Sequence, residues 1–409
     1  MNRHFIISVL VSALIGTETF AQNEGKNWTA TDNATLYSQM LTFLDGFQRD
    51  FAGEQTGYIL QDAMMRIKAA HQTDQYEWIS QVYDLCINLE AVYPAFVSNP
   101  NGGSGDRYEK IRRGILRLWD FPAHVCSSSN ADDKISPPAE QSKKYSEASI
   151  AHVQLKRDQM LDFLDTPRPS GNEMQLVKVY SSGFILRTKN ACIAFDICYN
   201  YAFASEDRMY DLIAKLDAVF YTHVHNDHYD GIFAEKMLDA GKVVVLPKDF
   251  LPGKTMANKI VWPSGQASLI DIVSGVRGCA QMAKQGSDDC LLYYVDMDGW
   301  RIIHNGDNDD HSKCVFFETK DRADIIFCDL FGGFTNYMTH FMKAPNPSNI
   351  STTYVTTHEN EWHHTVYRRI GYHYNFFHSS ALGNTAYAYP NYIGMDNGEH
   401  IVITKKSAQ

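Results

Sequence analysis

A strand that runs directly into a dense group of histidines and aspartates constrains this chain more than any other feature. The segment Asp217–Tyr221 is apolar enough to predict a strand, and the residues from Thr222 to Gly231 include three imidazoles and two carboxylates. Side chains alternate along an extended segment, so His223 and His225 point the same way and can share one cation. Asp227 and His228 begin a turn and can reach another. The pattern therefore predicts two neighbouring metal positions.

Two patterns of apolar residues divide the chain. From about Thr31 to Trp119 the apolar residues recur at helical spacing, whereas short β-branched strands alternate with helices after Pro169. We interpret this change as a smaller all-helical region followed by an α/β domain with layered packing. The expected segments are a signal peptide at residues 1–21, the helical region at 22–126, a linker at 127–142, a connecting helix at 143–173 and the α/β domain at 174–409.

Residues able to do chemistry follow the ends of predicted strands. Expected strands cover residues 175–180, 183–188, 191–197, 218–222, 243–246, 291–296, 300–304, 325–329 and 353–356. The histidine loop follows one of them, His304–Asp307 follows another, and Thr357–Glu361 follows the last. Rigid sheets commonly present functional loops at such positions.

The first 21 residues predict a secretory signal. Met1 to His4 is short and basic, Phe5 to Gly16 is apolar, and Ala21 ends a small-residue cleavage site. The apolar run of about 12 residues is too short to cross about 30 Å of hydrocarbon as a helix. We therefore expect an exported protein, periplasmic or secreted, with no integral membrane segment after cleavage.

The net charge narrows the classes of partner, and the cysteine content indicates where disulfides could form. The net charge is −11, and nucleic-acid binders usually carry a basic surface, so nucleic acid is an unlikely partner and a small-molecule substrate is expected. The oligomeric state is left open. Eight cysteines are scattered along the chain, and a small buried apolar role suits most of them. Cys279 and Cys290 flank a polar loop and are a candidate disulfide pair.

The histidine loop resembles that of the metallo-β-lactamase superfamily, which reads THxHxDHxxG and is matched here from Thr222 to Gly231 without a gap. The resemblance implies an αββα sandwich, two β-sheets flanked by helices, from about Met174 to the C-terminus. Two later motifs agree with it. Asn305-Gly306-Asp307 resembles the family motif whose aspartate bridges two metals, and His358 stands where the family has its last metal-binding histidine.

The resemblance implies two sets of metal ligands that share Asp307. The first consists of His223, His225 and Asp307, and the second of Asp227, His228, Asp307 and His358. Asp227 and Asp307 are also the expected catalytic residues. Asp196, which ends a predicted strand, is similar to a family aspartate that orients the histidine loop by hydrogen bonding.

One ligand of the family is missing. The superfamily supplies a third histidine to the first position, between the loop and the later aspartate, but this chain has no histidine between His228 and His304. Nearby histidines that are candidates to replace it are His304, His311, His363 and His364.

Hydrolysis is the reaction that such a site supports best, because a bound cation lowers the pKa of water from 15.7 to about 7 and polarises the bond under attack. We expect one or two zinc ions per chain, with iron or manganese as alternatives, and an ester, lactone, amide or phosphoester substrate. No serine-nucleophile, phosphate-loop or dinucleotide motif is present. Two other interpretations remain: a non-catalytic or sensory metal-binding domain with a degenerate first position, and redox chemistry at a di-iron site.

Overall fold

The computed structural model describes residues 30–93, 139–203, 205–308, 323–328, 352–357 and 392–405, with eight further positions between 108 and 121. These residues form two compact units. The first contains the described residues up to Cys86, those from Leu118 to Phe121 and residues 139–149, and the second contains the described residues from Ile87 to Ile115 and from Ile150 onward. The expected signal segment lies outside the described residues. Among the described helices, none has the length and apolar character needed to cross a membrane.

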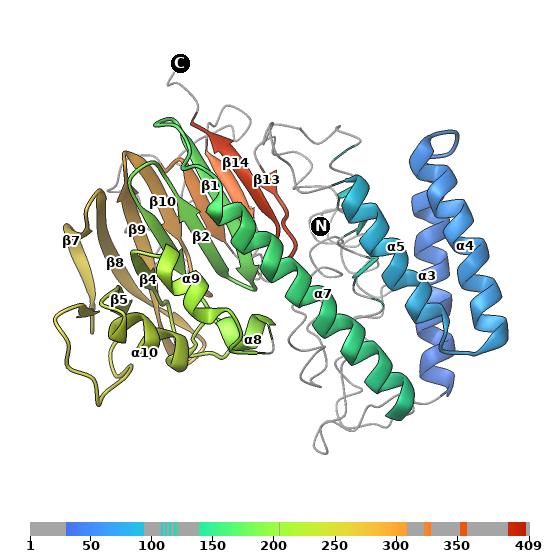
Figure 1. Ribbon diagram of the computed structural model, residues 1–409, viewed down its shortest axis with the longest axis horizontal. Helices are drawn as coiled ribbons and strands as arrows, with labels where there is room; N and C mark the ends of the chain where they lie inside the picture. The colour runs from blue at the N-terminus through green and yellow to red at the C-terminus, as the bar shows by residue number, and fades with distance from the viewer. Residues whose placement is uncertain are drawn as a thin grey trace, which may run out of the picture. The chain divides into compact units, whose positions relative to one another are not determined.

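The first unit is helical. It contains α3 (Ala30–Asp50), α4 (Gln55–Thr73) and the start of α5 (Trp78–Val92) (Figure 1). Apolar residues three or four apart form buried stripes on α3 and α4, made of Leu36, Met40, Leu44, Phe47, Leu60, Ala63 and Ile67. The buried Asn33 accepts a hydrogen bond from Trp78 Nε1 at 3.1 Å. The helical N-terminal region expected from the sequence is therefore confirmed.

The second unit contains two seven-stranded sheets. The first has the order β14-β1-β2-β3-β4-β5-β6 and the second β13-β12-β11-β10-β9-β8-β7. The strands of the first sheet are β1 (Glu173–Tyr180), β2 (Gly183–Arg187), β3 (Cys192–Phe195), β4 (Ala218–Phe220), β5 (Val243–Leu246), β6 (Lys259–Val261) and β14 (His400–Thr404). Those of the second are β7 (Gly265–Val273), β8 (Val276–Gln285), β9 (Asp288–Met297), β10 (Trp300–His304), β11 (Ile325–Cys328), β12 (Thr353–Thr356) and β13 (Tyr392–Ile393).

The two sheets pack face to face across one apolar core, to which strands of both contribute. Phe184 of β2 lies against Phe327 of β11, with ring centroids 4.4 Å apart, and Phe220 of β4 meets Tyr293 of β9 at 5.3 Å. Such aromatic contacts add to the burial of apolar area. The predicted α/β class with a two-sheet sandwich is confirmed.

Short helices pack on the first sheet. They are α8 (Tyr199–Phe203), α9 (Met209–Lys215) and α10 (Gly231–Asp239), and α10 contacts both β4 and β5 (Figure 1). Phe163 of α7 (Ala139–Asp165) stacks on His400 of β14 at 4.1 Å. The helix α7 begins inside the segment 127–142 that was expected to be a linker. The domain boundaries themselves stay predictions.

Cys279 and Cys290 do not form the disulfide considered from the sequence. In the β8–β9 register Cys279 lies opposite Tyr294, whereas Cys290 lies opposite Ala283. The two cysteines are thus offset by four residues, roughly 13 Å at about 3.3 Å per residue, which exceeds the separation that a disulfide spans. Cys290 is a buried thiol outside any disulfide.

Candidate metal centre

The histidine loop connects β4 to α10 and is held at both ends. Its base is joined to β9, because Leu291 N donates to Thr222 O at 2.9 Å. At its other end Asp230 caps α10 by accepting from Phe233 N at 3.0 Å. Between them, His228 N donates to His225 O at 3.0 Å and closes a turn. The loop therefore returns on itself and brings its side chains together.

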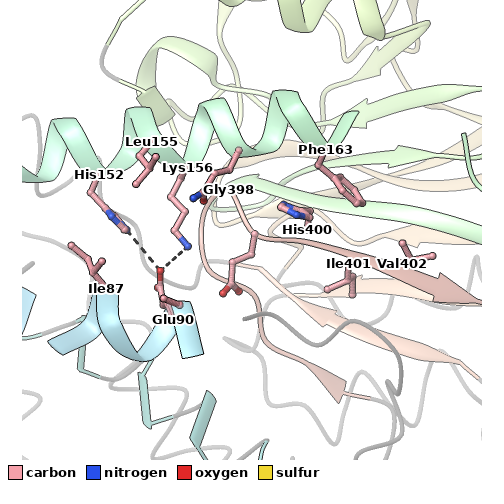
Figure 2. A pocket seen from close by; sticks show the side chains of 13 residues that line it. Ile87, Glu90, His152, Leu155, Lys156, Phe163, Gly398, His400, Ile401 and Val402 are labelled. Carbon is pink, nitrogen blue, oxygen red and sulfur yellow. Dashed lines mark ion pairs between the residues drawn. The ribbon is translucent and has the colours of Figure 1, made fainter. Parts of the chain in front are cut away.

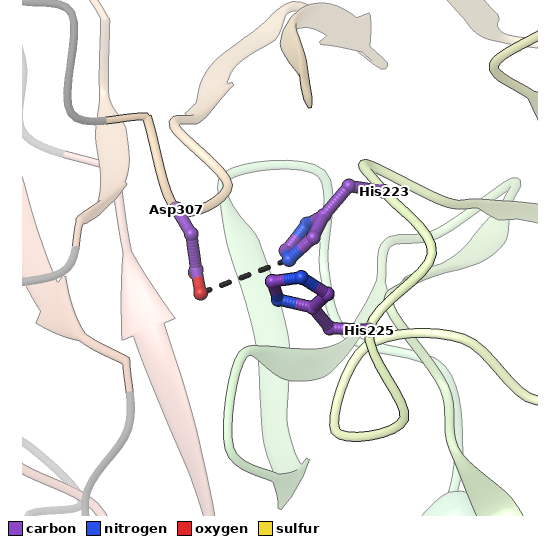
Figure 3. Close-up of side chains that lie close together, drawn as sticks. All are labelled: His223, His225 and Asp307. Carbon is purple, nitrogen blue, oxygen red and sulfur yellow. Dashed lines mark ion pairs between the residues drawn. The ribbon is translucent and has the colours of Figure 1, made fainter. Parts of the chain in front are cut away.

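Two groups of potential ligands converge at this loop. His223, His225 and Asp307 offer atoms that all lie within 4.8 Å of one another (Figure 3). Asp227, His228 and Asp307 do the same. Asp307 Oδ2 is 3.8 Å from His223 Nε2 and 3.1 Å from His228 Nε2. The structure thus brings together the described members of both predicted sets, with Asp307 common to the two. His358 lies outside the described residues, and the metal-binding roles stay predictions.

Asp196 orients two residues of the loop from the end of β3. Because β3 and β4 are parallel neighbours, Asp196 lies beside Thr222, and it accepts from Thr222 N and Thr222 Oγ1 at 2.7 Å each. Its Oδ2 also lies 2.8 Å from His228 Nδ1. Asp196 is fully buried and adopts a φ of +46°. This left-handed conformation, costly for a residue with a Cβ, fits a side chain held for a specific purpose.

Each imidazole of the loop uses one nitrogen for a neighbour. His223 Nδ1 is 3.0 Å from Thr222 Oγ1, and His228 Nδ1 is bound by Asp196 as described. His225 Nε2 is 3.0 Å from Asp288 Oδ2. The second nitrogen of each ring is then the one that remains to offer a cation, the arrangement usual for ligating histidines.

Asp307 depends on the glycine before it. Gly306 has a φ of +55°, and a Cβ there would lie 2.6 Å from Cys290 Sγ and 3.0 Å from Thr222 Cβ. Only glycine fits so close to β9 and the histidine loop. The strand β10 therefore delivers Asp307 from the second sheet to histidines carried by the first.

Burial and neighbouring charges set the protonation of the two buried histidines. Burial, reinforced by His228, lowers the pKa of His223 to about 3, so its ring is neutral at pH 7. Burial also lowers the pKa of His228, but Asp307, Asp227 and Asp196 outweigh it and raise that pKa well above the usual value. The pKa values of the two buried rings are therefore shifted in opposite directions by the same site.

The residues fit a divalent cation. His223 Nε2 is buried and has no hydrogen-bond partner within the described part of the chain, although it faces Asp307. A buried polar atom without a partner costs about 1–3 kcal/mol, and a cation between the ring and the carboxylate would remove that cost. Imidazole and carboxylate donors suit zinc, iron or manganese.

His304 does not replace the missing histidine of the first position. Its Nε2 lies 2.9 Å from Ser182 O, and its Nδ1 accepts from Gly306 N at 3.1 Å. Its ring also stacks on Phe195 at 4.9 Å. Both nitrogens are therefore engaged within the protein. The other candidate replacements, His311, His363 and His364, lie outside the described residues.

Two residues at this centre were not expected from the sequence. Asp288 contacts His225, and Gln285 Nε2 donates to Asp307 Oδ2 at 3.0 Å. Both lie at the turn between β8 and β9. Of these two strands, the sequence predicts only β9. The dipeptide Gly286-Ser287 was the available signal, because a glycine followed by serine between two strands is typical of a hairpin.

No protein-family model matches this chain, and no curated protein matches it. Several solved structures do match the chain, and it is similar to structures with the metallo-β-lactamase fold. Igni18, a metallo hydrolase from Ignicoccus hospitalis, is 18% identical, with 57% of this chain and 100% of that chain covered and a TM-score of 0.42. The isothiocyanate hydrolase from Delia radicum gut bacteria is 15% identical, with 57% and 100% covered and a TM-score of 0.42. The metallo-β-lactamase-fold protein YhfI from Bacillus subtilis is 11% identical, with 56% and 99% covered and a TM-score of 0.37.

A separate cavity of about 580 Å³ lies among the end of α5, α7 and β14 (Figure 2). It shares no lining residue with the ligand groups. Lys156 Nζ lies 2.6 Å from Glu90 Oε2 at its wall, and Arg112 pairs with Glu399 beside it. We call Glu90, Arg112, Lys156, Asp396 and Glu399 the buried charge cluster. Two carboxylates of this cluster pair with Arg112 and Lys156 of the same chain. We therefore interpret the cluster as structural ion pairs rather than as a ligand site.

Proposed function

We propose that this protein is a metal-dependent hydrolase that binds zinc at the histidine loop. The observation that carries the proposal is the buried His223 Nε2, which faces Asp307 without a hydrogen-bond partner in the described part of the chain. Two ligand groups sharing that aspartate support it further. When bound, the cation lowers the pKa of water to about 7 and polarises the bond under attack.

The chain's own residues give the site an open side. His223 and His228 are fully buried, whereas the side chains of His225 and Asp227 are 39% and 20% exposed. Substrate therefore approaches at the edge formed by His225 and Asp227. We propose that the Asp227 carboxylate orients a water molecule at this edge and accepts its proton.

The proposed substrate is a small molecule with an ester, lactone, amide or phosphoester bond. The open edge and the acidic balance of the chain support a neutral or weakly charged molecule better than a polyanion. We also propose that the protein is exported, on the basis of its basic and apolar N-terminal residues.

The test combines metal analysis with a panel of chromogenic lactone, β-lactam, ester and phosphodiester substrates. We expect purified wild-type protein to contain zinc and to hydrolyse at least one substrate, with loss of turnover on chelation and recovery on addition of zinc. His228→Ala should abolish turnover, whereas His71→Ala, a change on α4 in the first unit, should not. Bound metal without turnover on any substrate would favour the sensory interpretation instead.

A further inference from the structure

The hairpin of β8 and β9 reaches the first ligand group at two points. Gln285 and Asp288 face one another across the two-residue turn, in which Gly286 has a φ of +54°. Asp288 Oδ2 is 3.0 Å from His225 Nε2, and Gln285 Nε2 is 3.0 Å from Asp307 Oδ2. One turn therefore contacts two of the three residues that form the group.

Asp288 engages the outer nitrogen of His225. With Nε2 donating to Asp288, the lone pair of the neutral ring resides on Nδ1, and the ring cannot rotate without breaking the hydrogen bond. Asp196 does the same for His228 through Nδ1. Carboxylates that hold the second nitrogen of a ligating histidine fix its orientation and raise its basicity.

Asp288 is not itself in either ligand group. The two groups of converging ligand atoms within the described residues include His225 but not Asp288. Its contact is thus with the histidine rather than with the point where the ligand atoms meet. This geometry distinguishes a positioning residue from a replacement ligand.

We propose that the β8–β9 hairpin holds the first metal position together in place of the missing third histidine, with Asp288 positioning His225 and Gln285 positioning Asp307. The inference rests on the proposed metal-binding function. In this arrangement three of the described residues, His223, His225 and Asp307, would hold the first cation.

The role of Asp288 is separable from folding. The Asp288 and His225 side chains are 48% and 39% exposed, and exposed ion pairs contribute little to stability. Asp289 provides a matched control, because it is 52% exposed on the same hairpin and pairs with Lys284, away from the ligand groups.

The experiment is a cobalt(II) titration of the metal-free full chain, followed by visible absorption. We expect Asp288→Ala to weaken the weaker of two cobalt sites about 10-fold or more and to shift its absorption bands, with the tighter site unchanged. Asp288→Asn should recover most of the affinity, because an amide oxygen accepts the same hydrogen bond. Asp289→Ala should behave as wild type.

Gln285→Met gives a second signature. Because Gln285 contacts the aspartate shared by both groups, its loss should weaken both cobalt sites by a few-fold. Weakening of one site alone would overturn the role assigned to Gln285.

Three results would overturn the role of Asp288. Equal cobalt affinities for Asp288→Ala and Asp289→Ala would show that Asp288 has no positioning role. Asp288→Asn as weak as Asp288→Ala would make the carboxylate a direct ligand rather than a positioning residue. Wild-type protein that binds no cobalt would overturn the proposed function as well, whereas the first two results would leave that function standing.

Discussion

Two groups of ionisable residues in the second unit differ in how their buried carboxylates are neutralised. In the buried charge cluster, an ammonium and a guanidinium from the chain pair with Glu90 and Glu399. At the histidine loop, the ion pairs join imidazoles to carboxylates, and the buried His223 Nε2 has no hydrogen bond in the described part of the chain. In the first group the cations come from the protein's own side chains, whereas in the proposed function the second group would receive its cation from solution.

The contrast separates stability from function. Removing one member of a buried ion pair leaves an uncompensated charge and destabilises the fold. Removing one ligand from a site that binds a cation weakens binding of that cation. Variants in the two groups should therefore change different measured quantities.

The largest effect is expected at Arg112, which donates to Tyr93 O at 2.8 Å and pairs with the buried Glu399. Arg112→Met should lower the free energy of unfolding by about 3–5 kcal/mol, because Glu399 is left buried without its cation. Urea unfolding measures this, and the zinc content of the folded fraction should equal that of wild type. The control Arg277→Met removes an exposed pair with Asp271 and should cost less than about 1 kcal/mol. Equal losses in both variants would contradict the distinction.

Asp307→Asn should have the next largest effect, on metal affinity. Because both ligand groups share Asp307, the substitution should weaken both cations by more than about 100-fold, beyond what loss of an orienting partner costs. His223→Ala should instead release mainly the cation of the first group. Equilibrium dialysis with metal analysis provides the measurement. Retention of either cation at wild-type affinity in Asp307→Asn would show that the aspartate is not shared.

The dependence of stability on pH should distinguish the buried charge cluster from the histidine loop. Burial raises the pKa of Glu90, but Lys156, Asp396, His152 and Arg112 outweigh it and bring the pKa to about 2, from the ordinary 4.5. A carboxyl with a lowered pKa contributes stability that is complete above pH 4.5 and is lost as the pH falls towards 2.

Metal-free wild type should therefore lose roughly 2 kcal/mol more than Glu90→Gln across that interval. Urea unfolding at several pH values tests this, with Glu235→Gln, a change at an exposed pair, as control. Parallel acid profiles for wild type and Glu90→Gln would be inconsistent with a charged Glu90.

The smallest effect concerns Gly306. Gly306→Ala and Gly299→Ala both place a Cβ at positive φ, +55° and +79°, but only the first meets other atoms closer than 4 Å. The strain common to both should cancel, so the difference in unfolding free energy should be about 1–2 kcal/mol from crowding against Cys290 and Thr222. Gly306→Ala should also lower zinc affinity, because it displaces Asp307. Identical behaviour of the two variants would argue against the close fit.

Local patterns predicted much of the sandwich. The apolar β-branched strands from β1 to β5 and from β9 to β12 were expected at nearly their observed bounds. The strand β7 was not, because most of its residues are exposed or only partly buried, so no apolar alternation marks it. Its neighbour β8 contains mixed polar and small residues and is defined by pairing with β9 rather than by its own composition.

The residues of the site divide in the same way, into those that a local pattern predicts and those that depend on strand pairing. The histidine loop was recognisable because its ligands are adjacent in sequence, and Asp307 because it follows a strand. Asp288 was not, because it lies 63 residues from His225 and its contact depends on the register of an unpredicted hairpin. The pairing of Arg112 with Glu399, 287 residues apart, was beyond any local pattern for the same reason.

The shared aspartate also has a mechanical consequence. The histidines extend from the end of β4 in one sheet, and Asp307 from the end of β10 in the other, so a cation held by both would act as a cross-link between the sheets. Cross-links of this kind act mainly on the rate at which a structure opens, since separating the sheets then requires the cation to leave first. The loaded protein would thus be protected against proteolysis and slow unfolding at this end of the sandwich, and withdrawal of metal would shorten its lifetime before it altered its shape.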